Sequence, residues 1–428
     1  MSSSFTAQVY QNQFLAQGAD EVHAIMTVTA TGGTAAASGA KLVFGIMIDC
    51  SGSMGDSDAA RIRHAKMAVR EIIKQLREDS LFFIVSGADL ATLVVPLLPA
   101  TPENKAVAEN EIALLQASGG TTMSKWLQAA AQQFPRGDSF IRHALLLTDG
   151  KNNPEDTAPL DAALADCEGR FQCDARGVGV DWQPDQLRKI STRLLGTVDI
   201  IPKPQDIAAD FQEILQKAMG RAVSDVSLRL WTPQGSTIKF CKQVSPEIVD
   251  LTTKVRIDPQ APQIRNYPTG AWGNETRDYH FCLQVKPGAV GQRMLAGRAS
   301  LVLGRGKSET KAVETQILAT WTDDEARSAV IDRRVAHYTG QGELAQVIQE
   351  GLHARRQGHE DEATRKLGRA VQLAAESGND ATTKLLRKVV DVIDEHEGTV
   401  KLKRSIDEAD EMALDTRSTK TRRVKADV

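Results

Sequence analysis

Between Lys41 and about Gly220, short apolar runs alternate with amphipathic segments. The runs are typical of buried strands: Leu42–Ile48, Leu81–Val85, Ala144–Leu147, Gln172–Val180 and Val198–Ile201. Strands that are apolar at successive positions are covered on both faces, as in a parallel sheet with helices on each side. The pattern therefore predicts a doubly wound, Rossmann-like α/β domain at residues 40–220.

The segments between these strands carry apolar residues at helical spacing. The clearest is Ala59–Arg77, in which Ile62, Ala65 and Val69 share one face and basic residues occupy the rest. Further helices are expected at Glu103–Gln116, Lys125–Phe134, Leu160–Cys167, Pro184–Leu194 and Asp206–Met219. Ala91–Leu98 follows the second strand so closely that we expect it to be an antiparallel edge strand.

From about residue 221 to 321 the apolar period changes from helical spacing to two. Tyr279, Phe281 and Leu283, for example, alternate with more polar neighbours, and turn-forming clusters separate such stretches. This pattern indicates an all-β sandwich. Residues 1–39 hold strand-like segments of the same character, followed by a linker-like stretch at Thr31–Ala40. We expect these N-terminal strands to belong to the same sandwich, with the α/β domain inserted in it. The alternative is a separate N-terminal extension joined to the sheet edge.

Helical spacing returns after Trp321. Residues 322–397 are predicted to form a C-terminal α-helical region, with helices at Asp323–Tyr338, Leu344–Arg356, Glu360–Glu376 and Ala381–His396. Residues 398–428 are highly charged and lack aromatic residues, so a disordered tail is expected there.

Composition narrows the range of partners and compartments. The formal net charge of −3 over 428 residues gives no overall attraction to nucleic acid or to an anionic membrane, so neither is expected as a partner. The five cysteines are odd in number and match no disulfide framework, which favours a reducing compartment. The chain also shows no leader pattern at its start and no apolar run of membrane-spanning length, so a cytoplasmic protein is expected.

Three polar loops follow predicted strands or turns in the α/β domain. They are Asp49-Cys50-Ser51-Gly52-Ser53, Ser118-Gly119-Gly120-Thr121-Thr122 and Thr148-Asp149-Gly150. Together they resemble the three loops of the metal-ion-dependent adhesion site in von Willebrand factor A (vWA) domains. The resemblance covers about Lys41–Gly220. In an open α/β sheet, loops at the carboxyl ends of the strands converge where the strand order reverses, and ligands bind there.

The resemblance implies a site for one divalent cation, Mg²⁺ or alternatively Mn²⁺ or Ca²⁺. The expected metal ligands, direct or through water, are Asp49, Ser51, Ser53, Thr121 and Asp149. Thr122 is the alternative source of the third hydroxyl. Hard cations such as Mg²⁺ prefer oxygen ligands of this kind. Because only two of the ligands carry charge, the metal would remain electron-poor. The resemblance implies that it takes up an acidic residue of a partner protein.

These features lead to three function hypotheses. The first is a divalent-cation-dependent protein-protein interaction module in a bacterial signalling or assembly system. The second is an accessory subunit of a chelatase or AAA+ ATPase complex, which similar domains serve. The third is a magnesium-dependent hydrolase. The sequence contains no Gly-x-Ser-x-Gly motif and no phosphate-binding loop, so we do not expect an enzyme.

The C-terminal segment also offers candidate modification sites. Thr416, Thr419 and Thr421 are interleaved with Arg and Lys, and a phosphorylated threonine could be bound by an FHA-type protein. Bacterial vWA proteins, including the tellurium-resistance-associated group that this chain resembles in part, often accompany protein kinases and phosphatases. The alternative interpretation is a solvated basic tail.

Overall fold

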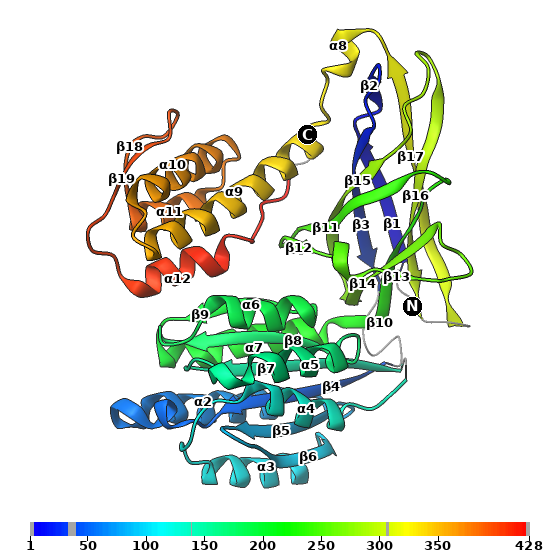
Figure 1. The fold of residues 1–428 in the computed structure, drawn as a ribbon. Coiled ribbons are helices and arrows are strands. Elements are labelled where there is room, and N and C mark those ends of the chain that lie inside the picture. Colours follow the sequence, from blue (N-terminus) through cyan, green and yellow to red (C-terminus); the bar gives the residue numbers. More distant parts are fainter. Residues whose placement is uncertain (1–3, 33–39, 138, 305–307, 425–428) are drawn as a thin grey trace. The chain divides into compact units, whose positions relative to one another are not determined.

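The computed structural model describes residues 4–32, 40–137, 139–304 and 308–424. The chain forms two compact units (Figure 1): one consists mainly of residues 32–224, and the other mainly of residues 4–31 and 225–428. The predicted fold class is confirmed, since an α/β domain, antiparallel sheets and a C-terminal helical region are all present.

The α/β unit is built on one six-stranded sheet with the order β6-β5-β4-β7-β8-β9. Its strands are β4 (Lys41–Asp49), β5 (Leu81–Gly87), β6 (Ala91–Pro99), β7 (Phe140–Thr148), β8 (Gln172–Val178) and β9 (Val198–Ile201). All neighbours are parallel except β5 and β6, which are antiparallel, as predicted for this edge strand. The chain runs outward from β4 to β6 and then returns to β7, so the strand order reverses between β4 and β7.

Helices cover both faces of this sheet. They are α2 (Asp56–Gln75), α3 (Pro102–Leu114), α4 (Met123–Gln133), α5 (Thr157–Cys167), α6 (Pro184–Arg193) and α7 (Ile207–Met219). Alternate residues of β4, such as Phe44 and Ile46, pack with Val69 of α2 and Phe211 of α7 in one core. Figure 1 shows α4, α5 and α6 over the other face. The predicted helices all form, with ends shifted by a few residues.

The second unit contains two large sheets, besides a two-stranded one near its C-terminal end. One has the order β1-β3-β15-β11-β12 and the other β13-β14-β10-β16-β17-β2. The bounds are β1 (Ser4–Gln11), β2 (Phe14–Ala16), β3 (Glu21–Thr31), β10 (Arg221–Trp231), β11 (Thr237–Ser245), β12 (Val249–Asp250), β13 (Arg256–Ile257), β14 (Ile264–Gly273), β15 (Glu275–Gln284), β16 (Arg293–Leu303) and β17 (Thr310–Thr322). Because β3 pairs with β15 along its length, strands from before and after the α/β domain share one sheet.

The C-terminal helical region differs in detail from the prediction. A short α8 (Glu325–Ser328) precedes α9 (Arg333–Arg356), which continues through Gly340, where a break was expected. α10 (Glu360–Glu376) forms as predicted. The last predicted helix is too long, because α11 (Asp380–Val389) gives way to a hairpin of β18 (Val390–Asp394) and β19 (Thr399–Leu402). The β-branched residues Val389, Val390 and Val392 favour a strand over a helix at this point.

The expectation of a disordered tail at residues 398–428 is wrong for the described part, which extends to residue 424. Helix α12 (Glu408–Arg417) lies within it, with Met412 and Leu414 buried. Several of its charges are paired with distant partners. Arg356 of α9 binds Asp415, and Arg423 donates to the buried Asp278 of β15 at 3.1 Å. Such pairing between distant residues cannot be seen in local composition, and residues 425–428 lie outside the described part.

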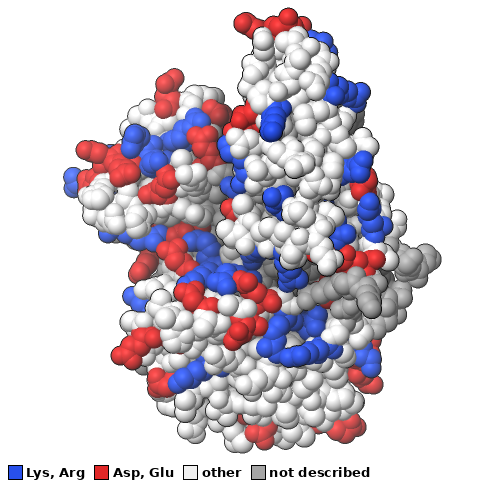
Figure 2. Space-filling view, turned by 45° about the vertical axis from the view of Figure 1, so that its right-hand side comes forward, with Lys and Arg blue, Asp and Glu red and all other residues white. Residues whose placement is uncertain are grey.

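The distribution of surface charge agrees with the near-neutral net charge of the chain. On the face shown in Figure 2, Lys and Arg side chains are interspersed with Asp and Glu. Among the helices in the described part of the chain, none combines the length and apolar character needed to cross a membrane.

Candidate metal centre

The three polar loops come together where the strand order reverses. Asp49 is the last residue of β4 and Thr148 is the last residue of the adjacent strand β7. The intervening loops are tied by backbone hydrogen bonds, from the Cys50 amide to the Gly87 carbonyl and from the Gly52 amide to the Gly119 carbonyl at 2.9 Å. The carboxyl end of the sheet thus positions side chains from distant parts of the sequence, as the sequence predicted.

Asp49 is fully buried and held at both carboxylate oxygens. Its Oδ1 accepts a hydrogen bond from the Ser51 amide at 2.7 Å, and its Oδ2 accepts one from the Thr148 hydroxyl at 2.5 Å. Both donors are neutral. The Asp49 carboxylate is therefore fixed in orientation, while among the described side chains no Lys or Arg forms an ion pair with it.

The remaining predicted ligands lie around the same point. The hydroxyls of Ser51 and Ser53 are 3.1 Å apart, and Ser53 donates to Oδ1 of the buried Asp149 at 2.7 Å. A Cβ atom placed on Gly150 would lie 3.4 Å from the Ser53 hydroxyl and 3.5 Å from the Thr121 hydroxyl. These contacts bring together the five predicted residues, which we call the oxygen cluster: Asp49, Ser51, Ser53, Thr121 and Asp149.

The glycines before Thr121 set its position. Gly119 has a φ of +82°, a region that glycine adopts without strain, and the Gly120 amide donates to the Asp89 carboxylate at 2.8 Å. Thr121 is consequently buried with its hydroxyl toward Gly150. Thr122, the alternative considered from the sequence, stands at the position immediately before α4. Thr121 is therefore the better candidate for the third hydroxyl.

Burial governs the electrostatics of the cluster. Burial raises the pKa of the Asp49 carboxyl to about 6, and the nearby Asp149 carboxylate adds to this rise. The hydrogen bonds from Ser51 and Thr148 oppose the rise without abolishing it. Ionised Asp49 is thus destabilised in the protein, and a bound cation would relieve that cost.

The sequence analysis missed one charged neighbour of the cluster. Arg61, near the start of α2, donates from Nη1 to Asp149 Oδ2 at 2.6 Å, and its Nη2 donates to Asp181 at 3.1 Å. In the sequence, Arg61 is one of several basic residues on the polar face of an amphipathic helix, so no local signal distinguishes it. Its contact neutralises one oxygen of Asp149, whereas the ion pairs formed by the described side chains do not include one to Asp49.

A further layer of contacts supports the loops. The Met123 amide donates to the Asn152 side chain at 2.9 Å, and Ser124 donates to Asp156 through both its amide and its hydroxyl. The indole of Trp126 donates to the Ala88 carbonyl at 2.8 Å. These residues join α4 to the loops that follow β5 and β7, which restricts the positions available to Thr121 and Asp149.

The donor set fits a hard divalent cation. It offers two carboxylates and three hydroxyls and contains no sulfur or imidazole, which is the preference of Mg²⁺ and Mn²⁺ rather than of softer metals. The buried, destabilised charge of Asp49 is the observation that most favours a cation here.

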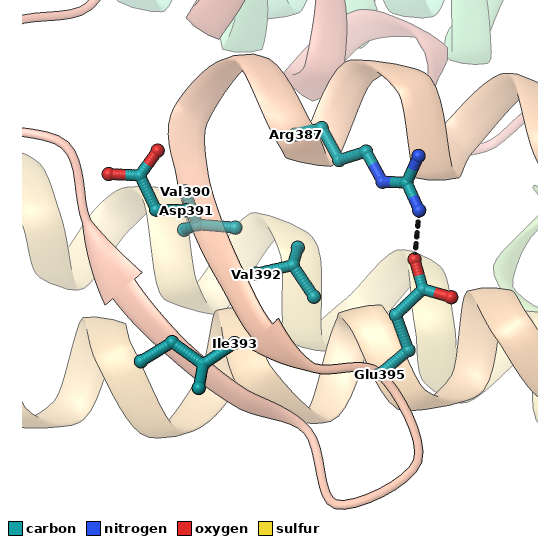
Figure 3. Close-up of a pocket in the computed structure, with 6 residues that line it drawn as sticks. All are labelled: Arg387, Val390, Asp391, Val392, Ile393 and Glu395. Atoms are coloured by element: carbon teal, nitrogen blue, oxygen red, sulfur yellow. Dashed lines mark hydrogen bonds and ion pairs between the residues drawn. The ribbon is translucent and has the colours of Figure 1, made fainter.

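A surface hollow beside β18 lacks such convergence. Its lining includes Val390, Val392 and Ile393, together with an ion pair between Arg387 and Glu395. Figure 3 shows this pair facing each other while Asp391 points away from it. Arg387 and Glu395 are already paired, and Asp391 lies 3.8 Å from Lys403, so this hollow offers little to a charged ligand.

The phosphorylation candidates are also placed by the structure. Thr416 is fully buried and donates to the Met412 carbonyl at 2.8 Å, so a kinase cannot reach its hydroxyl in this fold. Thr419 and Thr421 are partly exposed and bind Glu247 and the Val244 carbonyl. Phosphorylation of these two residues stays a prediction.

Comparison with known proteins agrees with this architecture. Residues 44–151 match a family model described as von Willebrand factor type A domain, and residues 372–418 match one described as von Willebrand factor type A C-terminal domain. The ArnB paralog VWA2 from Sulfolobus acidocaldarius has the same fold, with a TM-score of 0.61, 13% identity and 98% coverage of each chain.

Two relatives are closer in sequence. An uncharacterised protein of Synechocystis sp. is 27% identical over 214 residues, which are 49% of this chain, and the chain spans about half the length of that relative. The von Willebrand factor type A protein from Catenulispora acidiphila is 45% identical, with a TM-score of 0.93 over 98% of this chain and 97% of that one. On this match, the chain belongs to the von Willebrand factor type A family.

Proposed function

We propose that the protein is a divalent-cation-dependent interaction module, in which the oxygen cluster holds Mg²⁺ that takes up an acidic side chain of a partner protein. vWA domains generally mediate protein-protein interaction, and they often bind a divalent metal. The observation that carries the proposal is Asp49, a buried carboxylate with a pKa raised to about 6, to which the neutral Ser51 amide and Thr148 hydroxyl donate hydrogen bonds.

Each residue of the cluster has a distinct part in this proposal. Asp49 and Asp149 would supply the negative charge, and the hydroxyls of Ser51, Ser53 and Thr121 would complete a weakly charged oxygen set. Bound Mg²⁺ would supply a Lewis-acidic site with affinity for carboxylate oxygen. Arg61 forms an ion pair with Asp149, so less of the negative charge of Asp149 would be available to the metal. The cation would therefore keep an excess of positive charge for the partner.

The chemistry of the metal site also indicates the kind of partner, and the state of the cysteines indicates the compartment. The partner must present an exposed Glu or Asp, and we favour a bacterial signalling or assembly system. We also propose a reducing, cytoplasmic location, because all five cysteines are buried free thiols.

Affinity capture tests the proposal with three forms of the full chain. Wild-type protein should retain its partner in Mg²⁺ and lose it in EDTA, and Asp49→Ala should fail to retain it in either condition. The control is Asp185→Ala on α6, which removes an exposed carboxylate from the same domain and should behave as wild type. Equal recovery of the same partner by wild type and Asp49→Ala would refute the proposed role.

A further inference from the structure

A second group of metal-binding side chains lies in the other unit, on the sheet that contains β3 and β15. His23 of β3 and Cys282 of β15 stand directly opposite each other, and Glu21 lies two residues before His23 on the same face. Cys282 is buried, whereas Glu21 and His23 are partly exposed. His23 and Cys282 are 259 positions apart in the sequence, so no search for local spacing would find this group.

Three ligand atoms of this group form a nearly equilateral triangle. The Cys282 Sγ lies 3.7 Å from His23 Nε2 and 3.7 Å from Glu21 Oε2, and the latter two are also 3.7 Å apart. The centre of such a triangle is about 2.1 Å from each corner, which matches zinc distances of about 2.0–2.2 Å to N and O and nearly reaches the 2.3 Å typical of S. The side chains therefore need little rearrangement to share one ion.

Neighbouring groups hold these ligands in place. His280 Nε2 lies 3.1 Å from His23 Nδ1, so that the two rings share one hydrogen bond and His23 Nε2 remains directed toward Cys282. Phe240 of β11 packs edge-on against His280, with the ring centroids 4.9 Å apart. Lys239 binds Glu21 Oε1 at 2.5 Å, which leaves Oε2 directed toward the other two ligands. Supporting contacts of this kind are characteristic of metal-ligating histidines and carboxylates.

We propose that Glu21, His23 and Cys282 form a second metal site that takes Zn²⁺, with a fourth position open to water or to an external ligand. Thiolate and imidazole ligands select zinc or a similar metal, whereas the all-oxygen cluster of the α/β unit suits Mg²⁺. The two sites therefore select different metals. The zinc ion would also join β3, which precedes the inserted domain, to β15, which follows it.

Titration of metal-free full-length protein with Co²⁺ tests this proposal, because cobalt bound to a thiolate gives a charge-transfer absorption in the near ultraviolet. Wild type should bind one Co²⁺ with this absorption, and Zn²⁺, but not Mg²⁺, should displace it. Cys282→Ser should lose the absorption. Asp49→Ala, which disrupts the oxygen cluster, and Cys241→Ala, which removes a different buried thiol of the same sheet, should keep it.

A milder variant provides a second test in case Cys282→Ser does not fold. Glu21 is partly exposed, so Glu21→Gln should fold normally by circular dichroism while binding Co²⁺ at least tenfold more weakly. The proposal is overturned if wild type shows no thiolate-to-cobalt absorption at one equivalent, if Cys282→Ser retains it, or if Glu21→Gln binds Co²⁺ as tightly as wild type.

Discussion

The α/β unit contains two groups of acidic residues, one around Asp174 and the other around Asp49. Both of these aspartates are buried, but their pKa values are shifted in opposite directions. Toward the amino ends of β7 and β8, Asp174 accepts hydrogen bonds from His143 at 2.8 Å and from the Thr197 amide at 2.6 Å. Burial opposes its ionisation, but His143 and the guanidinium of Arg176 outweigh burial and hold its pKa well below the ordinary value. At the carboxyl end of β4, burial instead raises the pKa of Asp49 to about 6.

The difference lies in the source of positive charge. Arg176 binds Asp210 at 2.8 Å and also lowers the pKa of Asp174, while Arg221 binds His143 at 2.8 Å, so arginines of the chain itself supply positive charge around Asp174. Burial still raises the pKa of Asp210, so the opposite shifts are those of Asp174 and Asp49. At the second group, Arg61 is the basic residue that the described side chains place in an ion pair, and it contacts Asp149 rather than Asp49. A buried carboxylate without a cation is costly. The charge of Asp174 is therefore compensated by other residues of the chain, whereas Asp49 needs a positive charge that a metal ion can provide.

The largest expected effect is the loss of Asp174. Asp174→Ala would remove the buried carboxylate that accepts hydrogen bonds from His143 and from Thr197, and breaking a buried charged pair in this way costs about 3–5 kcal/mol. Urea unfolding followed by circular dichroism should show this decrease in the free energy of unfolding. A decrease below about 1 kcal/mol would mean that the paired group is not the stabilising feature described here.

Asp49 should respond in the opposite direction. In EDTA at pH 7, Asp49→Asn should raise the free energy of unfolding by about 1–3 kcal/mol, because it removes a buried charge and keeps a hydrogen-bonding side chain of similar shape. Asp185→Asn, at an exposed position, serves as the control and should change little. Destabilisation by Asp49→Asn in the absence of metal would contradict the contrast with Asp174.

The pH dependence of stability and of Mg²⁺ affinity gives a second test of the role of Asp49. The folded-state pKa of Asp49, about 6, lies above its unfolded value near 3.8, so the metal-free folded protein retains a proton that the unfolded chain has released. The free energy of unfolding should therefore fall as pH rises from about 4 to 6 and then level off, and Asp49→Asn should reduce this slope. Mg²⁺ affinity, measured by calorimetry, should weaken about tenfold for each pH unit below 6. Affinity independent of pH in this range would count against Asp49 as a ligand.

The smallest effect is expected at Arg61. Arg61→Gln removes a positive charge beside Asp149 and should tighten Mg²⁺ binding about threefold to tenfold. Lys74→Gln, on the exposed face of the same helix, is the matched control and should leave the affinity unchanged. Weaker binding in Arg61→Gln would show that this arginine organises the site instead of competing with the metal for Asp149.

The sequence predicted features that depend on local pattern. The oxygen cluster lies in three short motifs: two follow the ends of β4 and β7, which the strand topology places side by side, and the third lies in the loop between α3 and α4. The long-range electrostatic features could not be predicted in this way. Arg61 resembles any basic residue on a helix surface, and His23 and Cys282 meet only because β3 pairs with β15.

The C-terminal segment, residues 398–424, shows that local sequence can also suggest disorder where the structure is ordered. Its high charge and lack of aromatic residues indicated disorder, but the partners of its charges come from elsewhere in the chain. Asp278, for example, accepts hydrogen bonds from Tyr338 at 2.5 Å and from Arg423 at 3.1 Å. Composition describes a segment in isolation, so it overlooks stabilisation that arises only when the segment is docked.

Isothermal titration calorimetry with Mg²⁺ tests the central claim most directly. Wild-type protein at pH 7.5 should bind one Mg²⁺ per chain, and Asp49→Ala should lose this binding. Asp210→Asn, which changes a carboxylate paired with Arg176 away from the oxygen cluster, should bind Mg²⁺ as wild type does. If wild type takes up no Mg²⁺, or if Asp49→Ala binds it with undiminished affinity, the carboxyl end of β4 is not a metal site.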